Sequence, residues 1–266
     1  MESFHIELGP GRIHTVILGA GPDLVVGFHG FGESSSRFQA LADALHGFCK
    51  IAAIDLPFHG ISQWPEDEVL QPAQLCRLLQ QIKEHCRPNR LFVLGYSIGA
   101  RLALAAAIHC GRFDGLMLVA PDGLVQHTWY NVAVYPKWGR YLFRHFIEQP
   151  ALVFFLASLF RKLGLLSSSR YRILQQNADT APKRRKVYQT WMCLSALNVT
   201  EGQLANSLAR QFMSLKVLIG KYDRVLHRNR IRRIVGRLPH AELHMLACGH
   251  RVPDEEIIRE LRLWFH

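Results

Sequence analysis

The chain has 266 residues, of which 49% are hydrophobic and 20% are charged, and its formal net charge is +11. This composition is typical of a globular protein and excludes a disordered or fibrous chain. The length allows one large domain or a domain that carries an insertion. The most apolar segment, ALVFFLASLF at 151–160, is too short to cross a bilayer, so no transmembrane helix is expected.

The first residues, MESFHIELGPG, carry two glutamates and lack the basic and apolar regions of a signal peptide. The six cysteines form no CxxC pair; they are Cys49, Cys76, Cys86, Cys110, Cys193 and Cys248. In a chain of this length, such scattered cysteines favour reduced and mostly buried thiols over a disulfide framework. We therefore expect a cytoplasmic location.

Most of the positive charge lies in one segment. Residues 124–213 hold 12 Lys and Arg against three acids, a net charge of +9, and a second basic cluster lies at 228–237. A basic surface attracts nucleic acid, anionic lipid or an anionic substrate. Because no nucleic-acid motif accompanies these charges, we expect a solvated basic face, no nucleic-acid partner, and at most a weak attraction to anionic surfaces.

Short apolar runs begin the chain and alternate with helical patterns. Runs at 5–8 and 12–18, separated by Gly9-Pro10-Gly11, predict a hairpin. The strands predicted after it are 24–30, 51–57, 91–95, 115–121, 215–220 and 241–247. The predicted helices are 36–48, 70–86, 98–108, 227–236 and 254–265. This order predicts an α/β fold, with a mostly parallel central β-sheet and helices on both faces.

The alternation stops between residues 124 and 210, where the pattern is entirely helical and basic. An excursion of this length predicts an inserted helical cap over the sheet. The expected domains are therefore a core, residues 1–123 and 211–266, and a cap, residues 124–210.

The segment GYSIG at 95–99 places Ser97 between two glycines at the junction of a strand and a helix. G-x-S-x-G in this context is the nucleophile elbow, a sharp turn in which flanking β-carbons would collide with neighbouring elements. The helix N-terminus directs free N–H groups at negative charge formed beside the serine. The pattern predicts a nucleophilic Ser97; a serine that only caps the helix is the structural alternative.

A serine hydroxyl needs a base that accepts its proton. In an open parallel sheet, catalytic groups lie beyond the carboxyl ends of the strands, where His29, His59 and His250 are candidates. His250 follows the last strand in a loop that can fold over the sheet end. Asp223 follows the preceding strand and can hold the imidazole in the required tautomer. The chain order Ser97, Asp223, His250 matches this type of elbow.

Five blocks of the sequence resemble the α/β-hydrolase superfamily: HGFGES at 29–34, DLPFHGIS at 55–62, GYSIGA at 95–100, GKYDRV at 220–225 and CGH at 248–250. They span nearly the whole core and leave the cap unmatched. The resemblance implies that Ser97 is the nucleophile, His250 the general base and Asp223 its orienting acid. It also implies an oxyanion hole formed by the backbone N–H groups of Phe31 and Ile98.

Other residues at the strand ends have competing interpretations. Asp122 lies where some relatives of the superfamily place the acid. His29 is expected to support the oxyanion turn through a hydrogen bond, and His59 to pack within its loop. Cys248, beside His250, suggests a thiol nucleophile, but without an elbow around it a buried structural cysteine is favoured. No metal-binding motif occurs, so neither a metal nor a cofactor is expected.

The predicted activity is hydrolysis of a carboxylic ester or thioester through an acyl-enzyme. The candidate substrate contacts are Arg101, Phe58, Trp129 and Tyr130. The aromatic residues of the cap, Phe154 and Phe155 among them, favour a small-molecule substrate with an apolar acyl or aryl group.

Two other functions stay open. GYSIGARLAL also resembles the menaquinone-pathway synthase branch of the superfamily, where the arginine at the position of Arg101 contacts a substrate carboxylate. A lyase or C–C bond hydrolase of an anionic substrate is therefore an alternative, although many esterases have an arginine there in a surface salt bridge. The second alternative is a non-catalytic binding protein that keeps the scaffold.

Overall fold

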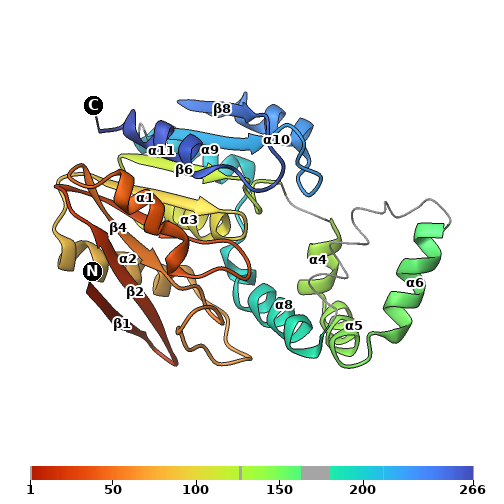
Figure 1. Ribbon diagram of the computed structural model, residues 1–266. Helices are drawn as coiled ribbons and strands as arrows, with labels where there is room; N and C mark the ends of the chain where they lie inside the picture. The colour runs from red at the N-terminus through yellow and green to blue at the C-terminus, as the bar shows by residue number, and fades with distance from the viewer. Residues whose placement is uncertain (1, 126–127, 163–179, 212, 266) are drawn as a thin grey trace.

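The computed structural model describes residues 2–125, 128–162, 180–211 and 213–265 (Figure 1). Its centre is an eight-stranded sheet in the order β1-β2-β4-β3-β5-β6-β7-β8. The strands are β1 (Glu2–Leu8), β2 (Gly11–Gly19), β3 (Asp23–Phe28), β4 (Cys49–Ile54), β5 (Leu91–Tyr96), β6 (Gly115–Val119), β7 (Ser214–Gly220) and β8 (Ala241–Leu246). The pairs β1–β2 and β2–β4 are antiparallel, and all the others are parallel. The predicted hairpin and mostly parallel sheet are confirmed.

Helices cover both faces of the sheet. Neighbouring residues of its central strands point to opposite faces, so each face has an apolar core that the helices bury. In β3, Leu24 and Val26 belong to the core on one face, whereas Val25 belongs to the core on the other. The first core also includes residues of α2 (Pro72–Cys86), α3 (Gly99–His109), α9 (Glu201–Gln211) and α10 (Arg228–Val235). The second includes residues of α1 (Gln39–Ala44) and α11 (Asp254–Arg262).

The helix predicted at 36–48 is shorter than expected. A 3-10 helix, Ser35–Phe38, precedes α1, which ends at Ala44. Gly47 has a φ of +90°, in a region that glycine adopts without strain. The chain therefore turns there toward β4 and does not continue the helix.

The cysteine prediction is wrong for one pair. Cys76 of α2 and Cys110, directly after α3, form a disulfide with their Cα atoms 4.7 Å apart. The two helices pack side by side, and this brings together two cysteines that share no motif. Cys49, Cys86 and Cys193 are free and buried, as expected, and Cys248 is free and half-buried. Because of the disulfide, the expectation of a cytoplasmic location loses part of its support.

The chain leaves β6 at its carboxyl end and forms α4 (Thr128–Val134), α5 (Lys137–Glu148), α6 (Ala151–Lys162) and α8 (Ala181–Cys193). Ring contacts join α5 to α8, where Phe143 lies 5.2 Å from Tyr188 and 5.3 Å from Trp191 between centroids. These helices lie beside the core, with α6 farthest from it (Figure 1). In contrast, α9 falls within the range predicted as cap and packs on α3.

Among the described residues, no helix is both long enough and apolar enough to span a membrane.

Candidate active site

Ser97 lies between the end of β5 and the start of α3, with a φ of +50°. A non-glycine residue in this left-handed region is strained, so the surrounding structure must hold it. The Ser97 amide donates to the Val119 carbonyl at 2.9 Å, and the Ser97 carbonyl accepts from the amides of Ala100 and Asp122 at 3.0 Å each. Backbone hydrogen bonds from β6, α3 and the following loop therefore fix the turn.

The glycines on either side of Ser97 are required by close approach of the backbone. A β-carbon at Gly95 would lie 2.6 Å from the Ala100 Cα. A β-carbon at Gly99 would lie 2.2 Å from the Phe28 carbonyl oxygen. Both distances are shorter than real contacts, so the spacing of the two glycines follows from how tightly α3 packs on β5 and β3.

Three side chains from separate loops form a hydrogen-bonded chain at this turn. Ser97 Oγ lies 3.1 Å from His250 Nε2, and His250 Nδ1 lies 2.8 Å from Asp223 Oδ2. Because an ionised carboxylate can only accept, we assign the imidazole proton to Nδ1. The lone pair of Nε2 then faces the serine hydroxyl.

The Asp223 carboxylate is completely buried and kept ionised by its partners. Burial alone would raise the pKa of Asp223, but the hydrogen bond and charge of His250, together with two backbone amides, lower it below its ordinary value. Those amides, from Val225 and Leu226, donate to Oδ1 at 2.7 and 3.2 Å. Asp122 instead pairs with Arg101.

Tyr96, which the sequence analysis did not identify, holds the loop that carries His250. Its hydroxyl donates to the His250 carbonyl at 3.3 Å and accepts from the Val252 amide at 3.0 Å. The Arg37 guanidinium lies 4.8 Å from the centre of the Tyr96 ring and donates to Asp254 at 2.6 Å. The only signal in the sequence was the position of a tyrosine directly before the elbow serine.

The turn after β3 is held by a buried, neutral histidine. His29 Nδ1 donates to the Gly30 carbonyl at 2.7 Å, and Nε2 accepts from the Leu56 amide at 3.1 Å. Burial lowers the pKa of His29 to about 4, so the ring stays uncharged. The expected support of this turn is therefore present. Within the described part of the chain, the amides of Phe31 and Ile98 make no backbone hydrogen bond.

His59 packs within its loop, as expected. Its ring contacts those of His29 and Phe31, at 5.2 and 5.4 Å between centroids, and Nδ1 donates to the Pro57 carbonyl at 2.9 Å. Nε2 is buried and has no hydrogen-bond partner among the described residues. Burial lowers the pKa of His59 to about 3.

Arg101 and Tyr130 lie together. The Arg101 guanidinium is buried and bonds the Asp122 carboxylate twice, at 2.9 and 3.2 Å, while the Tyr130 ring covers it at 3.9 Å. Tyr130 donates to the Trp191 carbonyl at 3.3 Å, so these contacts join the core to α8. Nη1 of Arg101 is buried without a hydrogen-bond partner in the described regions.

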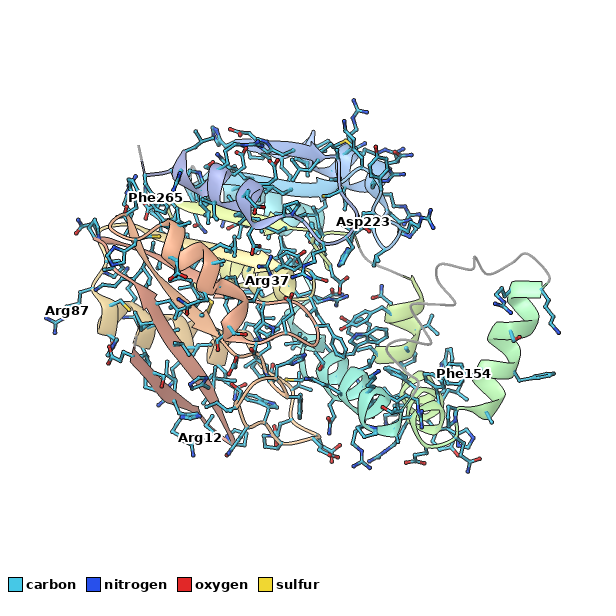
Figure 2. All side chains as sticks on the ribbon, viewed as in Figure 1. Arg12, Arg37, Arg87, Phe154, Asp223 and Phe265 are labelled. Carbon is cyan, nitrogen blue, oxygen red and sulfur yellow. A yellow bond between two sulfur atoms is a disulfide. The ribbon has the colours of Figure 1, made fainter. Side chains whose placement is uncertain are left out.

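The other candidate contacts differ in position. Phe58 is half-buried against the core with a φ of +63°, the region that favours glycine. Trp129 is the second residue of α4, but its side chain lies outside the described part of the structure. Phe154 and Phe155, the other aromatic residues named for the cap, lie in α6. Phe155 is 65% exposed, and Phe154 lies far from Asp223 (Figure 2).

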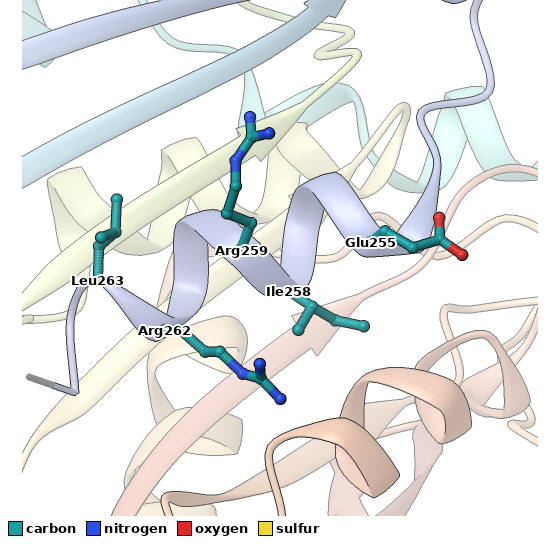
Figure 3. A pocket seen from close by; sticks show the side chains of 5 residues that line it. All are labelled: Glu255, Ile258, Arg259, Arg262 and Leu263. Atoms are coloured by element: carbon teal, nitrogen blue, oxygen red, sulfur yellow. The ribbon is translucent and has the colours of Figure 1, made fainter.

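The structure offers little support for a thiol or metal site. Burial raises the pKa of the Cys248 thiol and so disfavours the thiolate. No group of three or more His, Cys, Asp or Glu side chains could hold a metal ion within the described residues. An open hollow of about 420 Å³ is lined by Glu255, Ile258, Arg259, Arg262 and Leu263 (Figure 3). All five belong to α11 or directly follow it, so this hollow is separate from Ser97.

The chain was compared with known proteins. A model of the alpha/beta hydrolase family matches residues 25–259. A pimeloyl-(acyl-carrier protein) methyl ester esterase of Vibrio vulnificus is 32% identical over 97 residues, which are 36% of this chain and 35% of that protein. The alignment thus spans about a third of that relative's length. The uncharacterized hydrolase YugF of Bacillus subtilis is 23% identical over 249 residues, 90% of this chain and 88% of YugF.

Among solved structures, an esterase from Thermogutta terrifontis superposes with a TM-score of 0.68 at 17% identity, covering 99% of this chain and 98% of that one. At this identity the likeness concerns the fold alone. Together with the family match, it confirms the fold that the sequence resemblance predicted.

Proposed function

Since the chain belongs to the alpha/beta hydrolase family, we propose that it is a serine hydrolase that cleaves a carboxylic ester or thioester through an acyl-enzyme. The observation that carries the proposal is the hydrogen-bonded chain from Ser97 Oγ through His250 to the buried Asp223 carboxylate, with links of 3.1 and 2.8 Å. The Vibrio relative is named as a methyl ester esterase, which adds support for ester chemistry.

The first half-reaction acylates the serine. His250 Nε2 accepts the hydroxyl proton as Ser97 Oγ bonds to the acyl carbon, and the carbonyl electron pair moves onto oxygen. Asp223 accepts the Nδ1 hydrogen bond and stabilises the imidazolium that forms. The amides of Phe31 and Ile98 stabilise the oxyanion, a contribution of roughly 3 kcal/mol for each such donor.

Collapse of the first tetrahedral intermediate completes the acylation: the bond to the leaving oxygen or sulfur breaks, and His250 donates its proton to that atom. The second half-reaction releases the acid. A water molecule then gives a proton to Nε2 and attacks the acyl carbon. The second intermediate breaks the bond to Ser97 Oγ, which regains its proton from His250. No cofactor takes part in this scheme.

We assign substrate selection to the segment 124–210 as a cap on the core, residues 1–123 and 211–266. Its described helices α4, α5, α6 and α8 lie beside that core, whereas α9 packs on α3. Tyr130 and Phe58 are the described residues proposed to contact the substrate, and Trp129 is proposed from its place in the sequence. Tyr130 is buried beside Arg101, and Arg101 lies one helical turn after Ser97. These aromatic rings favour an apolar acyl or aryl group.

Hydrolysis of p-nitrophenyl esters of increasing acyl length tests the proposal. Ser97→Ala should reduce kcat/KM at least about a thousandfold. Ser3→Ala, at an exposed serine of β1, is the matched control and should leave it unchanged. A fluorophosphonate should label the wild type and not Ser97→Ala. Labelling that survives in Ser97→Ala, or ester hydrolysis equal to wild type, would refute the assignment.

A second candidate function is a lyase or C–C bond hydrolase reaction on an anionic substrate. It is favoured by Nη1 of Arg101, a buried donor with no partner in the described regions. A half-ester of a dicarboxylic acid, compared with the neutral diester, tests it in Arg101→Gln. Loss on the half-ester alone would support recognition of an anionic substrate by Arg101, the feature that this function requires. Equal loss on both would assign Arg101 to holding Asp122 and Tyr130.

A further inference from the structure

Helix α5 has two apolar faces, of which the described structure covers one. On the inner face, Ile147 is buried and Phe143 packs on Tyr188 and Trp191. On the outer face, Trp138, Tyr141 and Leu142 are 59%, 72% and 57% exposed. The spacing i, i+3, i+4 places these three on one stripe of the helix.

A neighbouring helix adds to the exposed apolar surface. Phe155 of α6 is 65% exposed, and α6 follows α5 after two residues. We call the three residues Trp138, Tyr141 and Leu142 of α5 the outer cap face. Large apolar side chains gathered in this way on a surface indicate an interaction site, whereas single exposed ones need no explanation.

The exposed charges of α5 and α6 are mostly positive. The exposed cations of these two helices are Lys137, Arg140, Arg144, Arg161 and Lys162, and Glu148, seven residues after Tyr141 and so on the same stripe of α5, is an exposed acid. Between residues 128 and 162 the sequence has one acid, Glu148. Two copies of this face would bring like charges together, which disfavours self-association through it. An anionic surface is complementary in charge.

We propose that the outer cap face binds the surface of an anionic lipid membrane. Trp and Tyr favour the boundary between lipid headgroups and acyl chains because their rings are apolar and each has a polar tip. A helix with such residues on one face and cations at its borders lies in the plane of that boundary. The cations add attraction to anionic headgroups. This inference does not depend on the serine mechanism.

Co-sedimentation with lipid vesicles tests the proposal. The purified full chain should bind vesicles of phosphatidylcholine with about a third phosphatidylglycerol at least tenfold more tightly than vesicles of phosphatidylcholine alone. Rising salt should weaken the binding, because salt screens the charges. Absence of binding to the anionic vesicles at low salt would overturn the proposal.

Matched variants distinguish binding through the outer cap face from nonspecific adsorption of the protein to vesicles. Trp138→Ser should weaken vesicle binding about fivefold, and the triple change with Tyr141→Ser and Leu142→Ser more than tenfold. Leu263→Ser, at a residue 61% exposed beyond α11, is the control and should bind like wild type. Circular dichroism verifies that each variant is folded. Equal loss in the control, or no loss in a folded triple variant, would refute the inference.

Two further measurements address the nature of the partner. Lys137→Gln with Arg144→Gln should reduce binding to anionic vesicles and leave binding to neutral ones unchanged. Light scattering measures the mass of the free protein. A dimer that the triple variant dissociates would show that a second copy occupies this face, and would replace the membrane proposal.

Discussion

Acidification should destabilise the protein through two buried histidines. Burial lowers the pKa of His29 to about 4 and that of His59 to about 3, from an ordinary value of 6.5. As the pH falls below 6.5, the unfolded chain binds protons at these rings while the folded chain does not. The free energy of unfolding therefore decreases with falling pH, and for each ring this decrease levels off below its folded pKa.

The size of the effect follows from the width of this window. Each pKa unit corresponds to about 1.4 kcal/mol, so at pH 5 each histidine should have lowered the free energy of unfolding by about 2 kcal/mol, and both by about 4 kcal/mol. Domains of this kind are stable by about 5–15 kcal/mol. Above pH 5, carboxylates with an ordinary pKa near 4 contribute little, so the window isolates the histidines.

Urea unfolding followed by circular dichroism, at intervals between pH 7.5 and 5, measures this dependence. His59→Asn retains a short N–H donor for the Pro57 carbonyl and removes the unpartnered Nε2. It should reduce the loss between these pH values by about half. His46→Asn, at an exposed histidine, should behave as wild type. A wild-type stability that is constant across the window, or an equally steep loss in His59→Asn, would refute the reasoning.

Two further substitutions address the elbow and the loop that faces it. Tyr96→Phe removes the hydroxyl between the His250 carbonyl and the Val252 amide. The kcat for an ester should therefore fall about tenfold with KM little changed, and the free energy of unfolding should fall by about 1–3 kcal/mol. Unchanged kinetics would contradict a positioning role. Gly99→Ala directs a methyl group at the Phe28 carbonyl oxygen, 2.2 Å away. The free energy of unfolding should fall by about 3 kcal/mol in the same urea assay. Stability equal to that of the wild type would show that α3 can move away from β3.

The core could be predicted from the sequence because its signals are local. Apolar runs identified each strand, and the buried strands are bounded by turn residues that interrupt the pattern. The two glycines around Ser97 indicated the close approach of α3 to the sheet, since a β-carbon at either position would collide with the backbone. Ser97, Asp223 and His250 each follow a parallel strand, so the topology alone brought them to the carboxyl end of the sheet.

Features that depend on how elements pack could not be predicted in this way. The Cys76–Cys110 disulfide depends on α2 and α3 lying side by side, and no motif in the sequence records that arrangement. Asp122 and Arg101 each had a separate interpretation, and only the fold shows that they bond each other. Tyr96 had no signal beyond its place before the elbow.

Aromatic residues of the segment between β6 and β7 show why composition alone could not identify the substrate contacts. Tyr130 is buried over Arg101, Phe143 joins α5 to α8, and Trp138 is exposed on the outer cap face. One residue class thus covers a buried arginine, joins two helices and lies exposed on a surface within a short stretch of chain. The apolar residues of α5 extend beyond the side that packs on α8, so their pattern alone does not say which of them face the core. On the outer side, exposed cations of α5, Lys137 and Arg144 among them, accompany the exposed aromatic residues, and the proposed membrane contact rests on both. Substrate preference should therefore respond to Tyr130 and not to Trp138, and vesicle binding should respond in the opposite way.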